Sequence, residues 1–369
     1  MKILILNWRD LSNPNAGGAE VVTHQHAKAW IKAGHEVFWI SSSFPGYRKE
    51  EIIDGVHFIR GGREFLGVHL FAFFTYFKKF INRIDLVIDE FHGIPFFTPL
   101  YVKEKKIAFI HEVAGEIWDK MYFFPINIIG KFLEKFYFRL YKNVKFWIDA
   151  PSVAFDLLKM GIPKKNITDI FCGINNKIKK APYLKNKQPT FIFVSRLVKM
   201  KGVEEIIRAF YFIKAKRKDV MLWIIGRGTK NYQKKLGSLV KKLGLKDNVI
   251  FYGFVKEKKK LNLMAKAHLL LHASIKEGWG LVVVEAASQG TPSVVYNVSG
   301  LRDVVKHNKT GLVLDKNTPR QMAKEALKLF RNKKLYRRFQ NNCLTWAGSL
   351  NWTKPTTKSL KLILEVANS

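Results

Sequence analysis

The chain has 369 residues, of which 47% are hydrophobic and 14% aromatic, so it exceeds what one hydrophobic core usually serves and predicts two domains. This composition excludes intrinsic disorder over most of the chain. The formal net charge of +35 divides into +8 for residues 1–180 and +27 for residues 181–369. The basic runs lack aromatic stacking motifs and a zinc-finger pattern, which disfavours binding to nucleic acid. We expect these runs to lie on solvated helix faces. The alternative is that they attract anionic lipid or nucleotide.

The first half of the chain alternates short apolar runs with amphipathic stretches, a pattern typical of a parallel sheet with crossover helices. Its start, MKILILNW, is too short for the apolar region of a signal peptide and predicts the first strand. We expect strands at 2–6, 36–41, 56–60, 85–89, 106–110 and 146–149. Helices are expected at 19–33, 67–82, 130–142 and 151–160.

The second half repeats this pattern after a polar stretch with Gly and Pro at 173–189, which is typical of a linker. We expect strands at 190–196, 220–225, 249–252, 268–271 and 292–295, then helices within 318–340 and after Pro355. Cys172 and Cys343 share no metal-binding or redox spacing and indicate a reducing compartment. Because no uncharged apolar stretch reaches about 18 residues, the sequence predicts a cytoplasmic protein, with the inner face of the membrane as a second location.

A Gly-rich loop, NPNAGGAE at residues 13–20, follows the first predicted strand. Gly17 and Gly18 permit a close approach of the backbone to a ligand, and the amides that begin the next helix favour an anion. The loop matches neither the dinucleotide fingerprint nor a P-loop, which disfavours NAD and ATP chemistry. A plain tight turn is the alternative.

Two cations follow the first strand of the second half, in VSRLVKMKG at residues 194–202. Open α/β sheets bind ligands outside the carboxyl ends of their strands, and Arg196 and Lys201 together suit a diphosphate. The alternative is a solvated basic turn.

Two glutamates eight residues apart, Glu277 and Glu285, flank a Gly-rich turn in EGWGLVVVEAASQGTP at residues 277–292. Carboxylates accept the hydrogen bonds that a ribose or hexose diol donates, whereas an acidic helix cap is the alternative. The turn leads into a helix, whose positive end favours phosphate. The amides expected there belong to Gly278, Trp279, Gly280, Leu281 and Val282.

On these motifs the chain resembles the retaining family 4 glycosyltransferases of twin-Rossmann (GT-B) architecture, from the GGAE loop to the closing helix. The resemblance implies an α/β fold with two Rossmann-like domains that face each other across a cleft. It implies an acceptor-binding domain at 1–180 and a nucleotide-sugar-binding domain at 181–350. Residues 351–369 are then expected to return as a helix to the N-terminal domain.

The resemblance also implies roles for single residues. Gly17 and Gly18 would face the donor phosphates, while Arg196 and Lys201 would hold the diphosphate and take part in catalysis. His111, in FIHE after the strand at 106–110, would be a catalytic residue near the anomeric carbon.

The two glutamates carry the remaining implied roles, in which Glu277 contacts the transferred sugar as a catalytic residue and Glu285 contacts the ribose. The chain departs from the family's pattern at Trp279, where Phe is common, and at 297–303, where NVSGLRD replaces two glycines followed by an acidic residue. Both departures concern the fit of the sugar and leave the charged groups in place.

The activity implied is transfer of a hexose or related sugar from a UDP- or GDP-sugar to a glycan or lipid-linked acceptor, as in polysaccharide or glycolipid biosynthesis. The family's route is same-face attack with retention, in which the leaving diphosphate helps to deprotonate the acceptor. The chain contains no D-x-D motif, so we expect no metal and no other cofactor. A nucleotide-sugar epimerase on the same fold and a basic nucleic-acid-binding protein are the alternatives.

Aromatic and basic residues are interleaved in the segments 73–80 and 122–147. One helical face of the second segment holds Ile129, Phe132, Leu133, Phe136 and Leu140. Such a face favours packing in the core. The alternative is a peripheral face that contacts an anionic membrane and approaches a lipid-linked acceptor.

Overall fold

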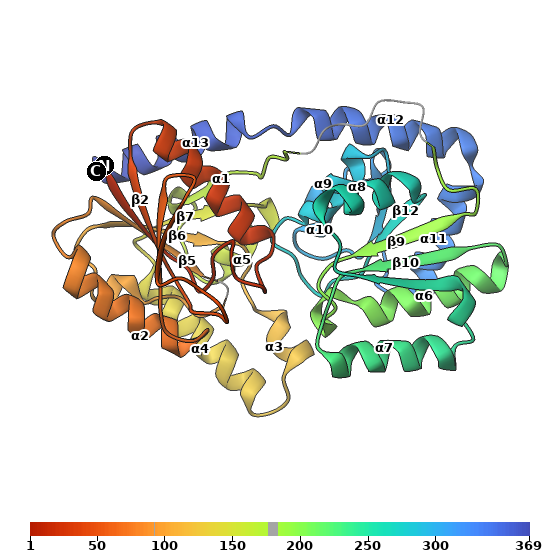
Figure 1. Ribbon diagram of the computed structural model, residues 1–369, viewed down its shortest axis with the longest axis horizontal. Coiled ribbons are helices and arrows are strands. Elements are labelled where there is room, and N and C mark those ends of the chain that lie inside the picture. Colours follow the sequence, from red (N-terminus) through yellow and green to blue (C-terminus); the bar gives the residue numbers. More distant parts are fainter. Residues whose placement is uncertain (92, 176–183) are drawn as a thin grey trace. The chain divides into compact units, whose positions relative to one another are not determined.

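The computed structural model describes residues 1–91, 93–175 and 184–369 (Figure 1). The chain forms two compact units, the first comprising Met1–Gly173 with Asn351–Ser369 and the second Ile174–Leu350. The sequence predicts the boundary between the two domains at 180/181. This position lies within residues 176–183, which are outside the described residues. Both units are built on a largely parallel sheet covered by helices, so the expected α/β fold is confirmed.

The sheet of the first unit has eight strands in the order β3-β4-β2-β1-β5-β6-β7-β8. All neighbours are parallel except β3 and β4, which form an antiparallel hairpin through Asp54 and Gly55, both with positive φ. Neither this hairpin nor the short edge strand β8 was predicted from the sequence. Asp-Gly is a hairpin signal that could have indicated the turn. The strands are β1 (Lys2–Leu6), β2 (Glu36–Ser41), β3 (Glu50–Ile53), β4 (Val56–Arg60), β5 (Leu86–Phe91), β6 (Lys105–Ile110), β7 (Lys145–Ile148) and β8 (Ile167–Asp169).

The last helix of the chain packs on the first unit, against α1 and β6. Its Ser359 hydroxyl accepts a hydrogen bond from Trp30 Nε1 at 3.1 Å and lies 2.8 Å from His26 Nδ1, all three residues being fully buried. Burial lowers the pKa of His26 to about 3, so this imidazole is neutral and structural. The helices of this unit are α1 (Gly18–Lys32), α2 (Leu66–Thr75), α3 (Glu116–Met121), α4 (Ile126–Leu140), α5 (Pro151–Lys159) and α13 (Thr353–Ala367).

The sheet of the second unit has six parallel strands in the order β11-β10-β9-β12-β13-β14. Its strands are β9 (Thr190–Val194), β10 (Met221–Ile225), β11 (Val249–Gly253), β12 (Leu269–His272), β13 (Ser293–Val295) and β14 (Gly311–Val313). Its helices are α6 (Val203–Lys216), α7 (Lys230–Lys242), α8 (Glu257–Lys266), α9 (Leu281–Ser288), α10 (Leu301–Val304), α11 (Pro319–Arg331) and α12 (Lys333–Ser349). The three-residue strand β14 was not predicted, because so short a run carries no periodicity.

Helix α4 contradicts the expectation that its apolar stripe packs in the core. Phe132 is 70% exposed, and Ile129, Leu133 and Phe136 are each more than half exposed. The buried face instead carries Glu134, whose carboxylate accepts hydrogen bonds from the amides of residues 114 and 115 and from the Trp118 indole. A carboxylate with four donors, the fourth being the Tyr137 hydroxyl, is satisfied when buried, so this face can turn inward.

Gly130 completes the buried face of α4. A Cβ atom on it would lie 2.3 Å from the Trp118 ring, so glycine is what lets this ring lie against the helix. No helix in the described ranges 1–91, 93–175 and 184–369 combines the length and the apolar character needed to span a bilayer.

Candidate functional site

The predicted site residues of the second unit lie on loops that leave β9, β12 and β13, three strands that are parallel neighbours at the centre of the sheet. The first loop carries Arg196 and Lys201, the second carries Glu277, and the third carries Ser299 and Gly300. Because parallel strands end at one edge, this order brings the loop after β9 together with two loops that come about 75 to 100 residues later in sequence. The site is therefore a product of strand order.

Lys201 and Glu277 form an ion pair, with 2.8 Å between Lys201 Nζ and Glu277 Oε1. The same carboxylate oxygen accepts a hydrogen bond from Ser274 Oγ at 2.7 Å and lies 3.2 Å from His272 Nε2. Burial alone would raise the pKa of Glu277, but the Lys201 charge and His272 outweigh it and hold that pKa well below its usual range. Glu277 is therefore ionised, and within the described residues its Oε2 has no hydrogen-bond partner.

Two glycines permit the close approaches that hold this pair. Gly202 has a φ of 70°, and a Cβ atom on it would lie 2.0 Å from the Ala273 carbonyl oxygen. Gly300 has a φ of 76°, and its Cβ would lie 2.3 Å from the Glu277 carbonyl oxygen. Beside it, the Ser299 carbonyl oxygen accepts a hydrogen bond from the Glu277 amide at 3.2 Å. The stretch that departs from the family's pattern thus supports the backbone of Glu277.

Gly202→Ala is expected to cost about 1–3 kcal/mol of stability, because alanine is strained at this φ and its methyl group would overlap a backbone oxygen. Gly237→Ala is the matched control, since Gly237 lies within α7 and an added methyl group there would meet nothing within 4 Å. Alanine at this helix position should stabilise the chain by about 0.8–1 kcal/mol. Urea unfolding of both variants measures the difference. Equal stability of the two would contradict the packing described for Gly202.

The amides predicted to bind phosphate lie where α9 begins. Gly280 precedes the helix with a φ of 86°, and Leu281 and Val282 are its first two residues. The first amides of a helix have no partner within it, so they point outward as donors for an anion. Gly278 and Trp279 form the turn that leads from Glu277 into this helix.

Glu285 lies in the second turn of α9 and is ion-paired with Lys260 of α8, with 2.8 Å between Nζ and Oε2. Burial raises the pKa of Glu285 even though Lys260 opposes the shift. Lys260 also pairs with Glu257 at 2.8 Å. Lys260 belongs to the basic run 256–260, and the sequence favours a solvated face for such runs. The sequence therefore does not predict that Lys260 pairs with Glu285.

Arg196 differs from Lys201, although both lie on the loop after β9. Its side chain is exposed and makes no ion pair or hydrogen bond with any residue that the structure describes. An unpaired guanidinium at the carboxyl edge of a sheet is ready for a bidentate contact with phosphate. The loop is held by Gly226, whose Cβ would lie 1.8 Å from the Ser195 carbonyl oxygen.

In the first unit, Gly17 is the N-cap of α1 and Gly18 is its first residue. The Gly17 amide donates to Glu20 Oε2 at 2.7 Å, so this amide is already satisfied within the helix start. Nothing in the unit requires glycine at position 17, because a Cβ there would meet only Glu20 at 3.7 Å. The loop after β1 therefore has open space beside the helix N-terminus.

His111 follows β6 and is buried between two carboxylates from neighbouring strands. Its Nδ1 is hydrogen-bonded to Asp149 Oδ2, after β7, and its Nε2 lies 3.1 Å from Oε1 of Glu90 in β5. Burial alone would lower the pKa of His111, but the charges and hydrogen bonds of Asp149 and Glu90 raise it to about 10. His111 is therefore an imidazolium at neutral pH, and both of its N–H groups donate to carboxylates.

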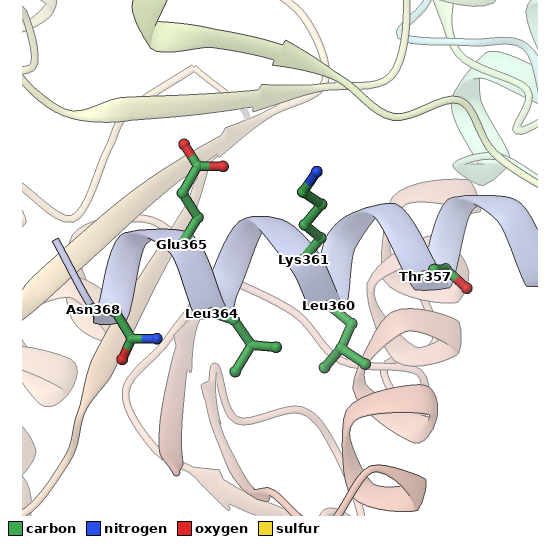
Figure 2. A pocket seen from close by; sticks show the side chains of 6 residues that line it. All are labelled: Thr357, Leu360, Lys361, Leu364, Glu365 and Asn368. Carbon is green, nitrogen blue, oxygen red and sulfur yellow. The ribbon is translucent and has the colours of Figure 1, made fainter.

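Two surface hollows of the first unit contain none of the predicted site residues. One, of about 440 Å³, lies along α13 and is lined only by that helix, on which Leu360 and Leu364 point away from Lys361 and Glu365 (Figure 2). The other, of about 790 Å³, is lined mainly by the strands β2, β3 and β4. Side chains of a single helix do not converge on a ligand, so the α13 hollow is not a candidate site.

Comparison with protein families gives two adjoining matches. Residues 16–177 match the family model described as Glycosyltransferase Family 4, and residues 175–346 match that described as Glycosyl transferases group 1. The two matches together run from the Gly-rich loop after β1 to residue 346 in α12.

Three known proteins illustrate the similarity. N-acetyl-alpha-D-glucosaminyl L-malate synthase of Bacillus anthracis is 24% identical over 88% of this chain and 87% of its own length. A GDP-mannose-dependent alpha-(1-6)-phosphatidylinositol monomannoside mannosyltransferase of Mycobacterium tuberculosis is 31% identical over 36% of each chain. The crystal structure of Anabaena HepE in complex with UDP and glucose superposes with a TM-score of 0.75 and 17% identity, covering 98% of this chain and 99% of that one.

Proposed function

The chain belongs to the family 4 glycosyltransferases, and on that premise we propose that it moves a hexose or related sugar from a UDP- or GDP-sugar to a glycan or lipid-linked acceptor, with retention at the anomeric carbon. The observation that carries the proposal is the Lys201–Glu277 ion pair between the loops after β9 and β12. It sets an ammonium group beside a carboxylate whose second oxygen is available for a sugar hydroxyl.

In the second unit, different residues bind the diphosphate, the transferred sugar and the ribose of the donor. Arg196 and Lys201 bind the diphosphate, together with the amides of residues 278–282 at the start of α9. Glu277 accepts a hydrogen bond from a hydroxyl of the transferred sugar, and Glu285 accepts from the ribose. Relatives support both donor nucleotides, since the Mycobacterium tuberculosis enzyme is GDP-mannose-dependent by name and HepE was solved with UDP and glucose.

The transfer we propose is a same-face substitution. The bond between the anomeric carbon and the phosphate oxygen breaks, the acceptor oxygen forms the new bond on the same face, and its proton passes to the leaving diphosphate. Arg196, Lys201 and the α9 amides stabilise the charge on that diphosphate, which is the task a metal ion performs elsewhere. We therefore propose transfer without a metal.

The first unit supplies the remaining proposed groups. The loop at Gly17 and Gly18 faces the donor phosphates, and His111 acts near the anomeric carbon. Both nitrogens of His111 are hydrogen-bonded to carboxylates. His111 therefore acts on the sugar either through the positive charge of the imidazolium or through an N–H that leaves Glu90 or Asp149 and donates to the sugar. The two cysteines of the chain are free and buried, which supports the cytoplasm as the location.

Nucleotide binding tests the proposal most directly. A nucleotide present at 100 times its dissociation constant should add about 2.7 kcal/mol to the stability of the unit that binds it. We expect UDP or GDP to raise the Tm by a few degrees in a thermal-shift measurement, with and without EDTA, and ADP and TDP to have little effect. Arg196→Ala is expected to abolish the shift.

Sugar transfer in EDTA completes this test. Transfer from the nucleotide sugar that gave the shift should continue when the chelator is added, because cations of the chain replace the metal. Loss of transfer in EDTA would contradict metal independence, and no shift with any nucleotide would contradict the donor site.

A further inference from the structure

The first unit exposes an extended apolar surface on α4 and on the turn before it. Phe123 and Phe124 are 86% and 82% exposed, and the exposed stripe of α4 continues through Ile129, Phe132, Leu133 and Phe136. A surface of this size on a folded unit marks an interaction site, since large exposed patches are otherwise selected against. We call these six residues the α4 face.

Helix α2 covers the same side of the sheet as α4 (Figure 1). Val87 and Asp89 are two residues apart in β5 and so point to one side. Val87 packs in the cluster that contains the buried face of α2, while Asp89 is hydrogen-bonded to the Tyr141 hydroxyl directly after α4. The outer face of α2 is also apolar, with Leu70 and Phe74 each more than 60% exposed.

Basic side chains flank the α4 face. Lys135, Arg139 and Lys142 are exposed, and none of them forms an ion pair with a carboxylate in the described part of the chain. The acidic residues nearby are already committed, since Asp119 pairs with Lys131 at 2.5 Å and Glu134 is buried. The surface therefore combines protruding aromatic rings with uncompensated positive charge.

We propose that the α4 face binds an anionic lipid bilayer, with Phe123, Phe124 and the apolar stripe of α4 in the acyl boundary and the basic residues at the headgroups. A helix with an apolar face and flanking Lys and Arg lies in this way at a membrane interface. A second copy of the chain fits less well, because a two-fold contact would bring like charges together. The proposal goes beyond the transfer reaction and can be tested without donor or acceptor.

Co-sedimentation of the full chain tests the proposal, using vesicles of phosphatidylcholine alone and of an equimolar mixture with phosphatidylglycerol. Binding is expected to the mixed vesicles and to be much weaker without the anionic lipid. Lys135→Gln/Arg139→Gln should weaken binding about 25-fold, at about fivefold for each basic residue. Phe132→Ser/Phe136→Ser should weaken it about tenfold or more, because two aromatic side chains no longer leave water.

Lys241→Gln/Lys242→Gln is the matched control, since it removes two exposed charges from α7 in the second unit. Its binding should change less than about twofold, because these lysines lie outside the α4 face. Equal weakening by the control pair would show that net charge alone attracts the chain and would overturn the proposal. It would also be overturned if Phe132→Ser/Phe136→Ser bound the mixed vesicles as well as the unchanged chain. The same holds if light scattering showed that the unchanged chain is a dimer and that this variant is a monomer with unchanged vesicle binding.

Discussion

Lys201→Met is expected to lower kcat about 100- to 1,000-fold, because it removes an ammonium group held where the leaving diphosphate gains charge. The geometry behind this expectation is the 2.8 Å contact between Lys201 and Glu277, which fixes the ammonium between the loops after β9 and β12. Lys201→Arg keeps the charge and should retain part of the rate. Initial rates of sugar transfer at saturating donor measure the effect.

The double variant Lys201→Met/Glu277→Gln separates catalysis from stability. Lys201→Met alone leaves the Glu277 carboxylate with 13% side-chain exposure and no cation, which destabilises the fold. In the unchanged chain the depressed pKa of Glu277 contributes stability above its unfolded pKa of about 4.3, and this contribution is lost as pH falls. The double variant should regain stability at neutral pH and stay inactive. Activity of Lys201→Met within about threefold of the unchanged chain would contradict the role in leaving-group stabilisation.

The elements that sequence periodicity predicted well are those with long apolar runs, such as β1, β2 and β9. The ion pair between Lys201 and Glu277 could not be predicted from sequence alone, because the two residues are 76 positions apart and meet only where β12 pairs with β9. Spacing showed that two cations and two glutamates lie near strand ends. Strand order decided that Lys201 and Glu277 meet, whereas the packing of α8 against α9 paired Glu285 with Lys260.

Helix α4 shows a different limit of sequence reasoning. Periodicity identifies an apolar face but does not say whether that face points inward. The signal that could have found the reversal is Gly130 on the opposite face, since a glycine inside a helix often marks a close approach by a neighbouring group. Glu134 gives no such signal, because acids are usual on a solvent face. His111 is similar, because the acids that follow or end β5 and β7 become its partners once the order β5-β6-β7 is known.

His111→Gln is expected to cost about 3–5 kcal/mol at neutral pH, because it leaves the buried carboxylates of Glu90 and Asp149 without a cation. In the unchanged chain the pKa of His111 is raised to about 10 from 6.5. The stability that this imidazolium contributes is therefore complete below about pH 6.5 and is lost as pH rises toward 10. The free-energy difference between the unchanged chain and His111→Gln should shrink between pH 7 and pH 10.

His24→Gln is the matched control for this experiment, because His24 is also buried in the first unit but burial lowers its pKa. His24 is thus neutral throughout the range from pH 7 to pH 10, and the cost of its replacement, about 1 kcal/mol, should not vary with pH there. Titration of lysines and tyrosines changes all three proteins alike and cancels from the differences. Urea unfolding at pH 7, 8.5 and 10 gives both differences, and a constant cost for His111→Gln would mean that His111 is neutral and that its carboxylates carry the proton instead.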